Sequence, residues 1–351
     1  MEEKKYRLLI IGPANRHIES FVARVINNTS SIELITNSKM NLPERVGVNY
    51  ISFSFKKPFN FFLAPYYIRK KIKEFKPDVI HVHQINSVAL YSVIANKKIK
   101  VPMVISAWGS DILINPVKSK ILRWLVRKVL NNGTAFTSDS LFMANKMREL
   151  VPQKELIIEI CNFGVQETEL IIKKEKVIYS NRMHNPLYRI VAVIDSFAHF
   201  ISSSENIEWK LVLAGRGSET NRLKQQVSEL GIDKNVIFAG FLTPEQNNNY
   251  YAKAAIFISM PQSDATAMSL LEAMYYGCFP ILSDLPANRE WVENGKNGII
   301  IDENNGDFIS DSLEYNFSQI GKINRERIIE EATVTVSSEK FVGIHKKAME
   351  L

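Results

Sequence analysis

Cysteine is scarce in this chain of 351 residues, which contains only Cys161 and Cys278. The two follow neither a zinc-ligand spacing nor a redox motif, so a disulfide framework and a cysteine metal site are excluded and a reducing compartment is favoured. No apolar run approaches the roughly 18 residues that a spanning helix needs. The first residues lead from charges into an apolar stretch too brief for a signal peptide. We therefore expect a cytoplasmic protein whose membrane contact, if any, is peripheral.

The composition is that of a folded globular protein. Hydrophobic residues make up 46% and charged residues 23% of the chain, which excludes the disordered and fibrous classes. The length of 351 residues exceeds the roughly 250–300 residues at which a single hydrophobic core stops growing. We therefore expect two domains.

Positive charge is concentrated in the first half of the chain. Residues 1–165 hold 25 Lys and Arg against 12 Asp and Glu, a net charge of +13, whereas the remaining residues carry a net charge of −6. This asymmetry indicates that the first half alone meets an anionic partner, such as a membrane surface, a nucleic acid or a phosphorylated acceptor.

Short apolar runs alternate with helix-length segments along the whole chain, which is typical of parallel strands joined by helical crossovers. The expected strands are 7–11, 31–35, 49–52, 79–82, 103–106, 135–137 and 156–160 in the first half, and 176–179, 210–214, 236–239, 255–258, 279–282 and 298–301 in the second. Continuous apolar strands predict sheets covered on both faces. The fold class is therefore α/β, with two doubly wound domains whose ligands bind beyond the carboxyl ends of the strands.

A polar connector rich in Lys and Glu between residues 164 and 176 marks the domain boundary. We expect an N-terminal domain at 1–168 and a C-terminal domain at 169–335. Residues 336–351 are expected to form a helix that packs back towards the N-terminal domain.

The segment 263–284 predicts a loop, a helix over 270–276, a glycine stop and a strand. Its first free backbone N–H groups are expected from Ala267, Met268 and Ser269. Such a helix start binds phosphate. Glu272 lies one turn into the helix, where its carboxylate can accept hydrogen bonds from two ribose hydroxyls, and Asp264 precedes it in the loop, where it can accept from a sugar.

This segment resembles the acidic pair, with seven intervening residues, of retaining glycosyltransferases of the family 4 type. The loop 180–188 resembles the family's diphosphate-binding loop, 211–217 its strand and glycine turn, 235–240 the strand beside the base, and 162–165 its Asn-x-Gly-Val element. The resemblance covers residues 176–302 closely and the N-terminal half loosely. It implies the GT-B fold, in which two Rossmann-like domains face each other across a cleft, the first binding the acceptor and the second the nucleotide-sugar.

Carried over residue by residue, the resemblance assigns the donor diphosphate to Arg182, the ribose to Glu272 and the orientation of the transferred sugar, a catalytic role, to Asp264. It adds to the donor site Gly12, Gly215, Met268 and Ser269. Retaining members of the family let the acceptor attack on the face that the nucleotide leaves. Because fixed positive charge and N–H dipoles can stabilise the leaving phosphate, we expect neither a metal nor a cofactor. The nucleotide-sugar, with UDP favoured over GDP, is a substrate.

The chain departs from the family pattern at three places. Asp264 stands where the family usually has Glu, and 106–111 replaces a His-Gly or His-Asp element near the acceptor. Leu187 and Tyr188 stand where the family often has Lys, so a second positive charge at the diphosphate would come from Arg189 or Arg216.

Strand ends in the N-terminal half supply acceptor-side candidates. His83 ends a strand, on the same side as His81 because strand side chains alternate, and Asp111 lies on the next such loop. We expect His83 and Asp111 to act in catalysis by steering the acceptor hydroxyl. The alternatives are packing roles for the histidines and a turn cap for Asp111.

The acceptor itself is expected to contact three further residues. They are Asn15, His17 and Trp108. Asn15 and His17 follow Gly12 where the first helix opens. For Trp108, packing in the core is the alternative to stacking on a sugar ring.

Two segments, 56–76 and 118–130, mix basic residues with aromatic or aliphatic ones. Basic amphipathic helices of this kind can lie on an anionic leaflet. Together with the net charge of the first half, they predict peripheral association with the inner face of the membrane. The alternative is an ordinary crossover helix with a solvated basic face.

The expected reaction is transfer of a sugar from a nucleotide-diphosphate donor to a hydroxyl of a glycan or lipid-linked acceptor in cell-surface polysaccharide biosynthesis. The alternatives are a GT-B-like epimerase or phosphorylase, and a catalytically silent sugar-nucleotide-binding subunit. Nucleic-acid binding is not expected, because no reading module accompanies the positive charge.

Overall fold

The computed structural model describes residues 5–169, 173–301 and 307–351. The chain divides into two compact units, unit 1 with Met1–Phe163 and Val334–Leu351 and unit 2 with Gly164–Thr333. The boundaries lie at 163/164 and 333/334, where the sequence indicated 168/169 and 335/336. The difference arises because Val165 already pairs with Thr333, and its N–H donates to the carbonyl of Ala332 at 2.7 Å.

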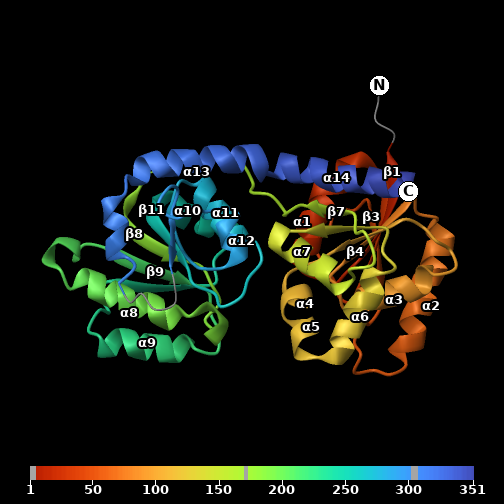
Figure 1. Ribbon diagram of the computed structural model, residues 1–351, viewed down its shortest axis with the longest axis horizontal. Coiled ribbons are helices and arrows are strands. Elements are labelled where there is room, and N and C mark those ends of the chain that lie inside the picture. The colour runs from red at the N-terminus through yellow and green to blue at the C-terminus, as the bar shows by residue number, and fades with distance from the viewer. Residues whose placement is uncertain (1–4, 170–172, 302–306) are drawn as a thin grey trace. The chain divides into compact units, whose positions relative to one another are not determined.

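Unit 1 is built on a seven-stranded parallel sheet in the order β3-β2-β1-β4-β5-β6-β7 (Figure 1). Its strands are β1 (Tyr6–Ile11), β2 (Thr29–Thr36), β3 (Val46–Tyr50), β4 (Val79–His83), β5 (Met103–Ser106), β6 (Ala135–Ser138) and β7 (Ile158–Ile160). The strand expected at 49–52 lies earlier because β3, at the sheet edge, takes its register from β2 alone. That pairing ends where Thr36 meets Tyr50.

The helices of unit 1 cover its sheet. They are α1 (Arg16–Val25), α2 (Asn60–Phe75), α3 (Ser87–Asn96), α4 (Ser110–Leu113), α5 (Asn115–Lys118), α6 (Lys120–Leu130), α7 (Leu141–Leu150) and α14 (Val334–Glu350). α1 and α14 contact each other and share a core with the sheet that includes Phe21, Val22 and Phe341. α3 contacts β4 and lies between α2 and α6, which therefore belong to one layer.

Unit 2 is built on a six-stranded parallel sheet in the order β10-β9-β8-β11-β12-β13. Its strands are β8 (Glu175–Ser180), β9 (Lys210–Ala214), β10 (Val236–Gly240), β11 (Ala254–Ser259), β12 (Phe279–Ser283) and β13 (Ile299–Ile301). Its helices are α8 (Ile190–Ile201), α9 (Thr220–Glu229), α10 (Pro244–Lys253), α11 (Met268–Tyr275), α12 (Pro286–Arg289) and α13 (Phe317–Glu331).

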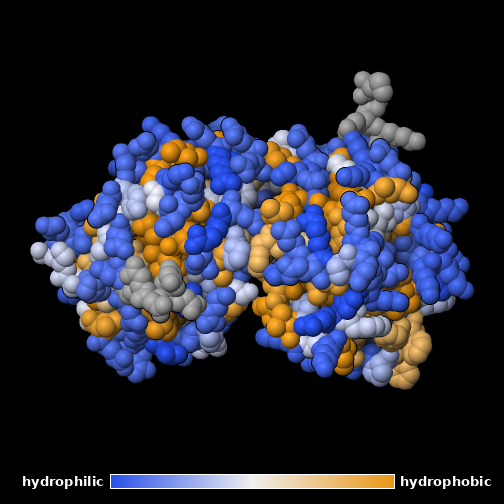
Figure 2. All heavy atoms as spheres, in the orientation of Figure 1, coloured by the Kyte–Doolittle hydropathy of each residue, from blue (hydrophilic) through white to orange (hydrophobic). Residues whose placement is uncertain are grey.

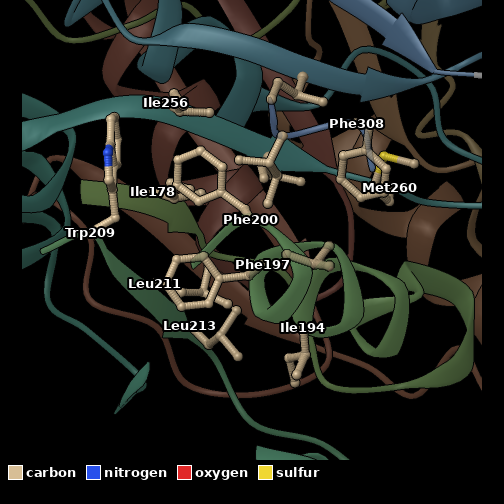
Figure 3. Close-up of a cluster of buried hydrophobic side chains, with 14 of the residues drawn as sticks. Ile178, Ile194, Phe197, Phe200, Trp209, Leu211, Leu213, Ile256, Met260 and Phe308 are labelled. Atoms are coloured by element: carbon tan, nitrogen blue, oxygen red, sulfur yellow. The ribbon is translucent and has the colours of Figure 1, made fainter. Parts of the chain in front are cut away.

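Alternate residues of each strand fill two separate cores in unit 2. Leu211 and Leu213 of β9 face one core, with Phe197 and Phe200 of α8 and Trp209 (Figure 3). The neighbouring residues of the same strand face a second core, against α10 and α11. Both faces of the sheet are therefore covered, as the continuous apolar strands predicted. The two parallel sheets confirm the α/β class with two Rossmann-like domains.

None of the helices in the described part of the chain combines the length and the apolarity that crossing a bilayer requires.

Candidate active site

The loop that follows β8 carries a buried arginine. Arg182 is 9% exposed, and its Nη1 donates to Oγ of Ser269 at 2.8 Å. Its Nη2 donates to the carboxylate of Asp264, in the loop after β11. The guanidinium also lies over the ring of Tyr188, 4.4 Å from its centroid. Three residues expected at the donor site thus come together from separate parts of the chain.

Helix α11 begins beside this arginine, because Ser269 is its second residue. Ala267 is the N-cap, and its carbonyl accepts from the N–H of Leu270 at 3.0 Å. The helix therefore starts at Met268, two residues before the expected start at 270. The N–H groups of a first helical turn lack intrahelical partners and carry partial positive charge. Together with Arg182 they make this point suited to an anion.

Glu272 faces a polar network that no sequence pattern had indicated. The Oη of Tyr251 donates to Oε2 of Glu272 at 3.0 Å, and Nδ2 of Asn247 approaches the same oxygen at 3.4 Å. Asn181 donates to Tyr251 at 2.8 Å, and Tyr179 donates to Asn247. Burial, and then the charge of Glu272, raise the pKa of both tyrosines. Their hydroxyls therefore stay protonated; that of Tyr251 orients the carboxylate directly, and that of Tyr179 holds Asn247.

The end of β8 and the loop that follows it hold four buried polar atoms without a hydrogen-bond partner among the described residues. They are Ser180 Oγ, Asn181 Oδ1, Arg182 Nε and His184 Nε2. Buried polar atoms in folded proteins are nearly always paired, with protein groups, water or a ligand. They fall within five consecutive positions beside the start of α11, so water or a polar ligand is expected to pair with them there.

Two glycines allow the loop after β9 to approach this site. A Cβ on Gly215 would lie 2.6 Å from the carbonyl oxygen of Arg182, and one on Gly217 would lie 2.2 Å from that of His184. Gly215 also has a φ of +106°, which side-chain-bearing residues rarely adopt. Glycine at position 215 therefore lets the loop after β9 pack directly against the backbone of Arg182.

The two candidates for a second positive charge differ in their surroundings. Nε of Arg189 donates to the carbonyl of Met260 at 2.8 Å, which fixes the loop ahead of Asp264. Arg216 is exposed and lies against Gly240, at the end of β10. Arg216 is thus the more exposed of the two.

In unit 1, Gly12, Asn15, His17 and Trp108 lie where β1 and β5 end. Asn15 caps α1, its Oδ1 accepting from the N–H of Ile18 at 3.2 Å. The rings of His17 and Trp108 are 4.9 Å apart. A Cβ on Gly12 would lie 2.5 Å from Cδ1 of Ile18 and 3.2 Å from Cβ of His83, so glycine lets this turn pack closely against both side chains.

His83 is fully buried and stacks on His81, with ring centroids 4.4 Å apart, as their alternation in β4 predicted. Within the described chain, neither ring nitrogen of His83 has a hydrogen-bond partner, and the same holds for Nε1 of Trp108. Burial, and then the charges of His17 and His345, lower the pKa of His83. His83 is therefore neutral at physiological pH and buried rather than exposed to an acceptor.

The carboxylate of Asp111 is occupied by backbone groups. It is 1% exposed and accepts from the N–H of Ile85 at 2.8 Å and from that of Trp108 at 3.0 Å. Asp111 therefore ties the loops after β4 and β5 together. This geometry matches the capping role that the sequence left open for Asp111, and its expected contact with an acceptor hydroxyl stays a prediction.

The chain is similar to known proteins over most of its length. Residues 165–334 match the family model described as glycosyl transferases group 1, and residues 8–140 match that described as glycosyl transferase 4-like. A curated relative, alpha-monoglucosyldiacylglycerol synthase of Streptococcus pneumoniae, is 25% identical over 231 residues, which are 58% of this chain and 51% of that protein. The chain thus matches about half the length of that relative.

Two solved structures share the fold over nearly the whole chain. A glycosyltransferase from Rickettsia africae has a TM-score of 0.80 at 15% identity and covers 99% of both chains. Anabaena HepE in complex with UDP has a TM-score of 0.76 at 13% identity and covers 97% of this chain and 100% of its own. The two matching family models, on the two units that the structure separates, lead to one assignment. The chain is a member of the group 1, family 4-type glycosyltransferases with the GT-B fold.

Proposed function

We propose that this protein is a retaining glycosyltransferase that moves a hexose from a UDP-sugar to a hydroxyl of a glycan or lipid-linked acceptor in cell-surface polysaccharide biosynthesis. One observation carries the proposal: Arg182, Asp264 and Ser269 meet at the amino end of α11, with Glu272 one turn further on.

In the proposed reaction the diphosphate takes the donors of Arg182 and the first amides of α11, and the ribose takes the carboxylate of Glu272. Asp264 accepts from hydroxyls of the transferred sugar. The acceptor hydroxyl attacks the anomeric carbon on the face that the nucleotide leaves, a β-phosphate oxygen takes the hydroxyl proton, and UDP departs. The guanidinium and the helix end stabilise the charge on the leaving phosphate. We propose that the reaction is therefore metal-independent.

The choice of donor and acceptor rests on similar proteins. Anabaena HepE, which shares the fold, was solved with UDP, and this supports UDP as the nucleotide. The Streptococcus pneumoniae relative is named for a product that carries a diacylglycerol lipid, and this supports a lipid-linked acceptor.

We further propose that unit 1 meets the anionic inner face of a membrane. Phe59 and Phe62 at the start of α2 are 77% and 76% exposed, and Ile121 and Trp124 of α6 are 75% and 57% exposed. Basic residues of α6 surround Trp124 along an open groove of about 320 Å³; they are Lys120, Arg123, Arg127 and Lys128. Exposed apolar side chains among cations suit the headgroup region of an anionic leaflet.

A panel of nucleotide-sugars, read by thermal stabilisation, tests the donor site. A ligand at about 100 times its dissociation constant adds about 2.7 kcal/mol of stability, so a UDP-sugar should raise the melting temperature of the wild type. Glu272→Ala and Arg182→Ala should each cut that rise by about half or more relative to their own unliganded melting temperatures, because tenfold weaker binding leaves about 1.4 kcal/mol of the stabilisation. An undiminished rise in melting temperature in both variants would contradict the proposed donor site.

Labelled UDP-sugar with a lipid-linked acceptor tests the reaction itself. Transfer of the label supports the proposal, interconversion of the free donor would make the protein an epimerase, and binding alone would make it a silent subunit.

Sedimentation with vesicles tests the membrane surface. Binding to phosphatidylglycerol vesicles should exceed binding to phosphatidylcholine vesicles and fall in Trp124→Ser. Equal binding to both vesicle types would contradict the membrane proposal.

A further inference from the structure

A network of four hydrogen-bonded side chains in unit 2 ends on Glu272 and lies below the surface. Figure 2 shows one face of the molecule covered largely by hydrophilic residues, which water solvates. Tyr179 and Tyr251 are instead fully buried, each at 0% exposure, so their hydroxyls depend on protein partners. Asn247 and Asn181 supply these partners. The network thus joins β8 and the loop after it to α10, and through Glu272 to α11.

The charge of Glu272 fixes the direction of every hydrogen bond in this network. An ionised carboxylate only accepts, so the amide of Asn247 turns its nitrogen towards Oε2 of Glu272, 3.4 Å away, and its oxygen towards Tyr179. That oxygen also accepts from Nδ2 of Asn181 at 3.1 Å, and the second N–H of Asn181 donates to Oη of Tyr251 at 2.8 Å. The hydroxyl proton of Tyr251 is donated to Oε2 of Glu272, at 3.0 Å. Asn247 and Tyr251 therefore both act as donors to one carboxylate oxygen.

The same directions leave one acceptor of the network without a partner. Both N–H groups of Asn181 are used, so its Oδ1 can only accept, and this buried atom has no hydrogen-bond partner among the described residues. Asn181 directly precedes Arg182, which binds Asp264 and Ser269 at the start of α11. The network therefore holds two kinds of acceptor beside the proposed diphosphate site, a carboxylate and an amide oxygen. Oriented acceptors suit a ligand that donates through hydroxyl groups.

We propose that Tyr251 and Asn247 are positioning residues that make this enzyme selective for a ribonucleotide over a 2′-deoxyribonucleotide. They hold the carboxylate of Glu272 in one orientation, in which it accepts from the ribose hydroxyls. A carboxylate that is fixed before binding loses little rotamer freedom when the nucleotide arrives. A site that accepts from a hydroxyl discriminates against an analogue that lacks it, because the acceptor is then left unpaired. The inference rests on the proposed function and deepens it, because it names the residues that set the nucleotide class.

Calorimetric titration of the full-length protein with UDP and with 2′-deoxy-UDP tests the proposal. The wild type should bind UDP at least about tenfold more tightly than 2′-deoxy-UDP. Tyr251→Phe keeps the ring and removes the hydroxyl, and a hydrogen bond to a charged group is worth about tenfold or more in affinity. The preference of Tyr251→Phe for UDP should therefore fall to about threefold or less, and that of Asn247→Leu should fall in the same direction. A general structural defect would instead weaken both nucleotides equally and leave the preference unchanged.

Tyr250→Phe is the matched control. Tyr250 is the neighbouring tyrosine of α10, and its ring stacks on that of Tyr179 with centroids 5.4 Å apart. This variant keeps the ring contact, so the preference for UDP should change by no more than about twofold. An unchanged preference in both Tyr251→Phe and Asn247→Leu, with unchanged circular dichroism, would overturn the proposal. A wild type that binds both nucleotides equally, or an equal loss of preference in Tyr250→Phe, would also overturn it.

The failure of this inference is distinguishable from the failure of the proposed function. If UDP does not bind the wild type, the proposed donor site is wrong, and the role of the network is wrong with it. If UDP binds in a way that depends on Arg182 and Glu272, but the preference over 2′-deoxy-UDP does not depend on Tyr251 or Asn247, only the role of the network is wrong.

Discussion

The ion pair between Arg182 and Asp264 predicts that removing the carboxylate charge strengthens nucleotide binding. The two side chains are 10% and 26% exposed, so solvent screens the pair only in part. A diphosphate must take donors of Arg182 from Asp264 and then lie near a charge of its own sign. Breaking a charge-assisted hydrogen bond costs roughly 1.5–3 kcal/mol, which the nucleotide has to offset on binding.

Asp264→Asn should remove most of this cost without disturbing the loop. The side-chain oxygen that accepts from the N–H of Ala265, at 3.1 Å, is retained in asparagine. We expect UDP alone to bind about tenfold more tightly, equivalent to about 1.4 kcal/mol. Sugar transfer should fall in the same variant, because Asp264 is proposed to orient the sugar.

Isothermal titration of UDP into the wild type, Asp264→Asn and Arg182→Ala measures this effect. Arg182→Ala is the opposite control and should weaken binding by about tenfold or more, because it removes the cation itself. Weaker binding of UDP to Asp264→Asn, in a protein whose circular dichroism is unchanged, would refute the reasoning.

Three further predictions concern stability. Gly215→Ala should abolish stabilisation by UDP, because its Cβ would lie 2.6 Å from the carbonyl oxygen of Arg182. Gly231→Ala is its control: with a φ of +67° and nothing within 4 Å, it should lower the free energy of unfolding by about 1–2 kcal/mol and retain UDP binding. Equal shifts of the melting temperature by UDP in both variants would contradict this. Gly343→Ala, in α14 with nothing within 4 Å, should raise the free energy of unfolding by about 0.5–1 kcal/mol in denaturant titrations, and no gain would argue against it. Burial lowers the pKa of His81 and brings that of His345 to about 3. In the unfolded chain histidine pKa values lie near about 6.5, so on acidification the unfolded chain takes up protons before the folded chain does. The stability that these two residues contribute is therefore complete above about pH 7 and should fall by about 1.4 kcal/mol per histidine for each pH unit below about 6.5. A denaturant midpoint that stays constant between about pH 7 and about pH 5 would refute this.

The grouping of the proposed donor-side residues was predictable from sequence because it depends on local spacing. Asp264, Ser269 and Glu272 belong to one loop and helix, and the interval between them fixes which side chains lie near the helix start. The helix began two residues earlier than expected, since Ala267 acts as its cap. Helix ends depend on individual capping hydrogen bonds, which a periodic pattern does not resolve.

The surroundings of Asp111 and His83 could not be predicted from the sequence pattern. A carboxylate after a strand has the same sequence pattern whether it faces a substrate or binds two backbone amides. In this fold the backbone N–H groups of Ile85 and Trp108 donate hydrogen bonds to the carboxylate of Asp111. His83 stands at a strand end, yet Phe21 and Trp108 pack against its ring.

The sequence by itself determined the two α/β units and the presence of a helix directly after Asp264, because strand and helix periodicity are local properties. Tertiary structure alone decided what surrounds these elements. Tyr251 and Asn247 meet Glu272 from another helix, and Arg182 contacts Asp264 and Ser269 from the loop after β8. Contacts between residues far apart in the chain depend on how strands are ordered in a sheet, and no spacing along the chain records that order.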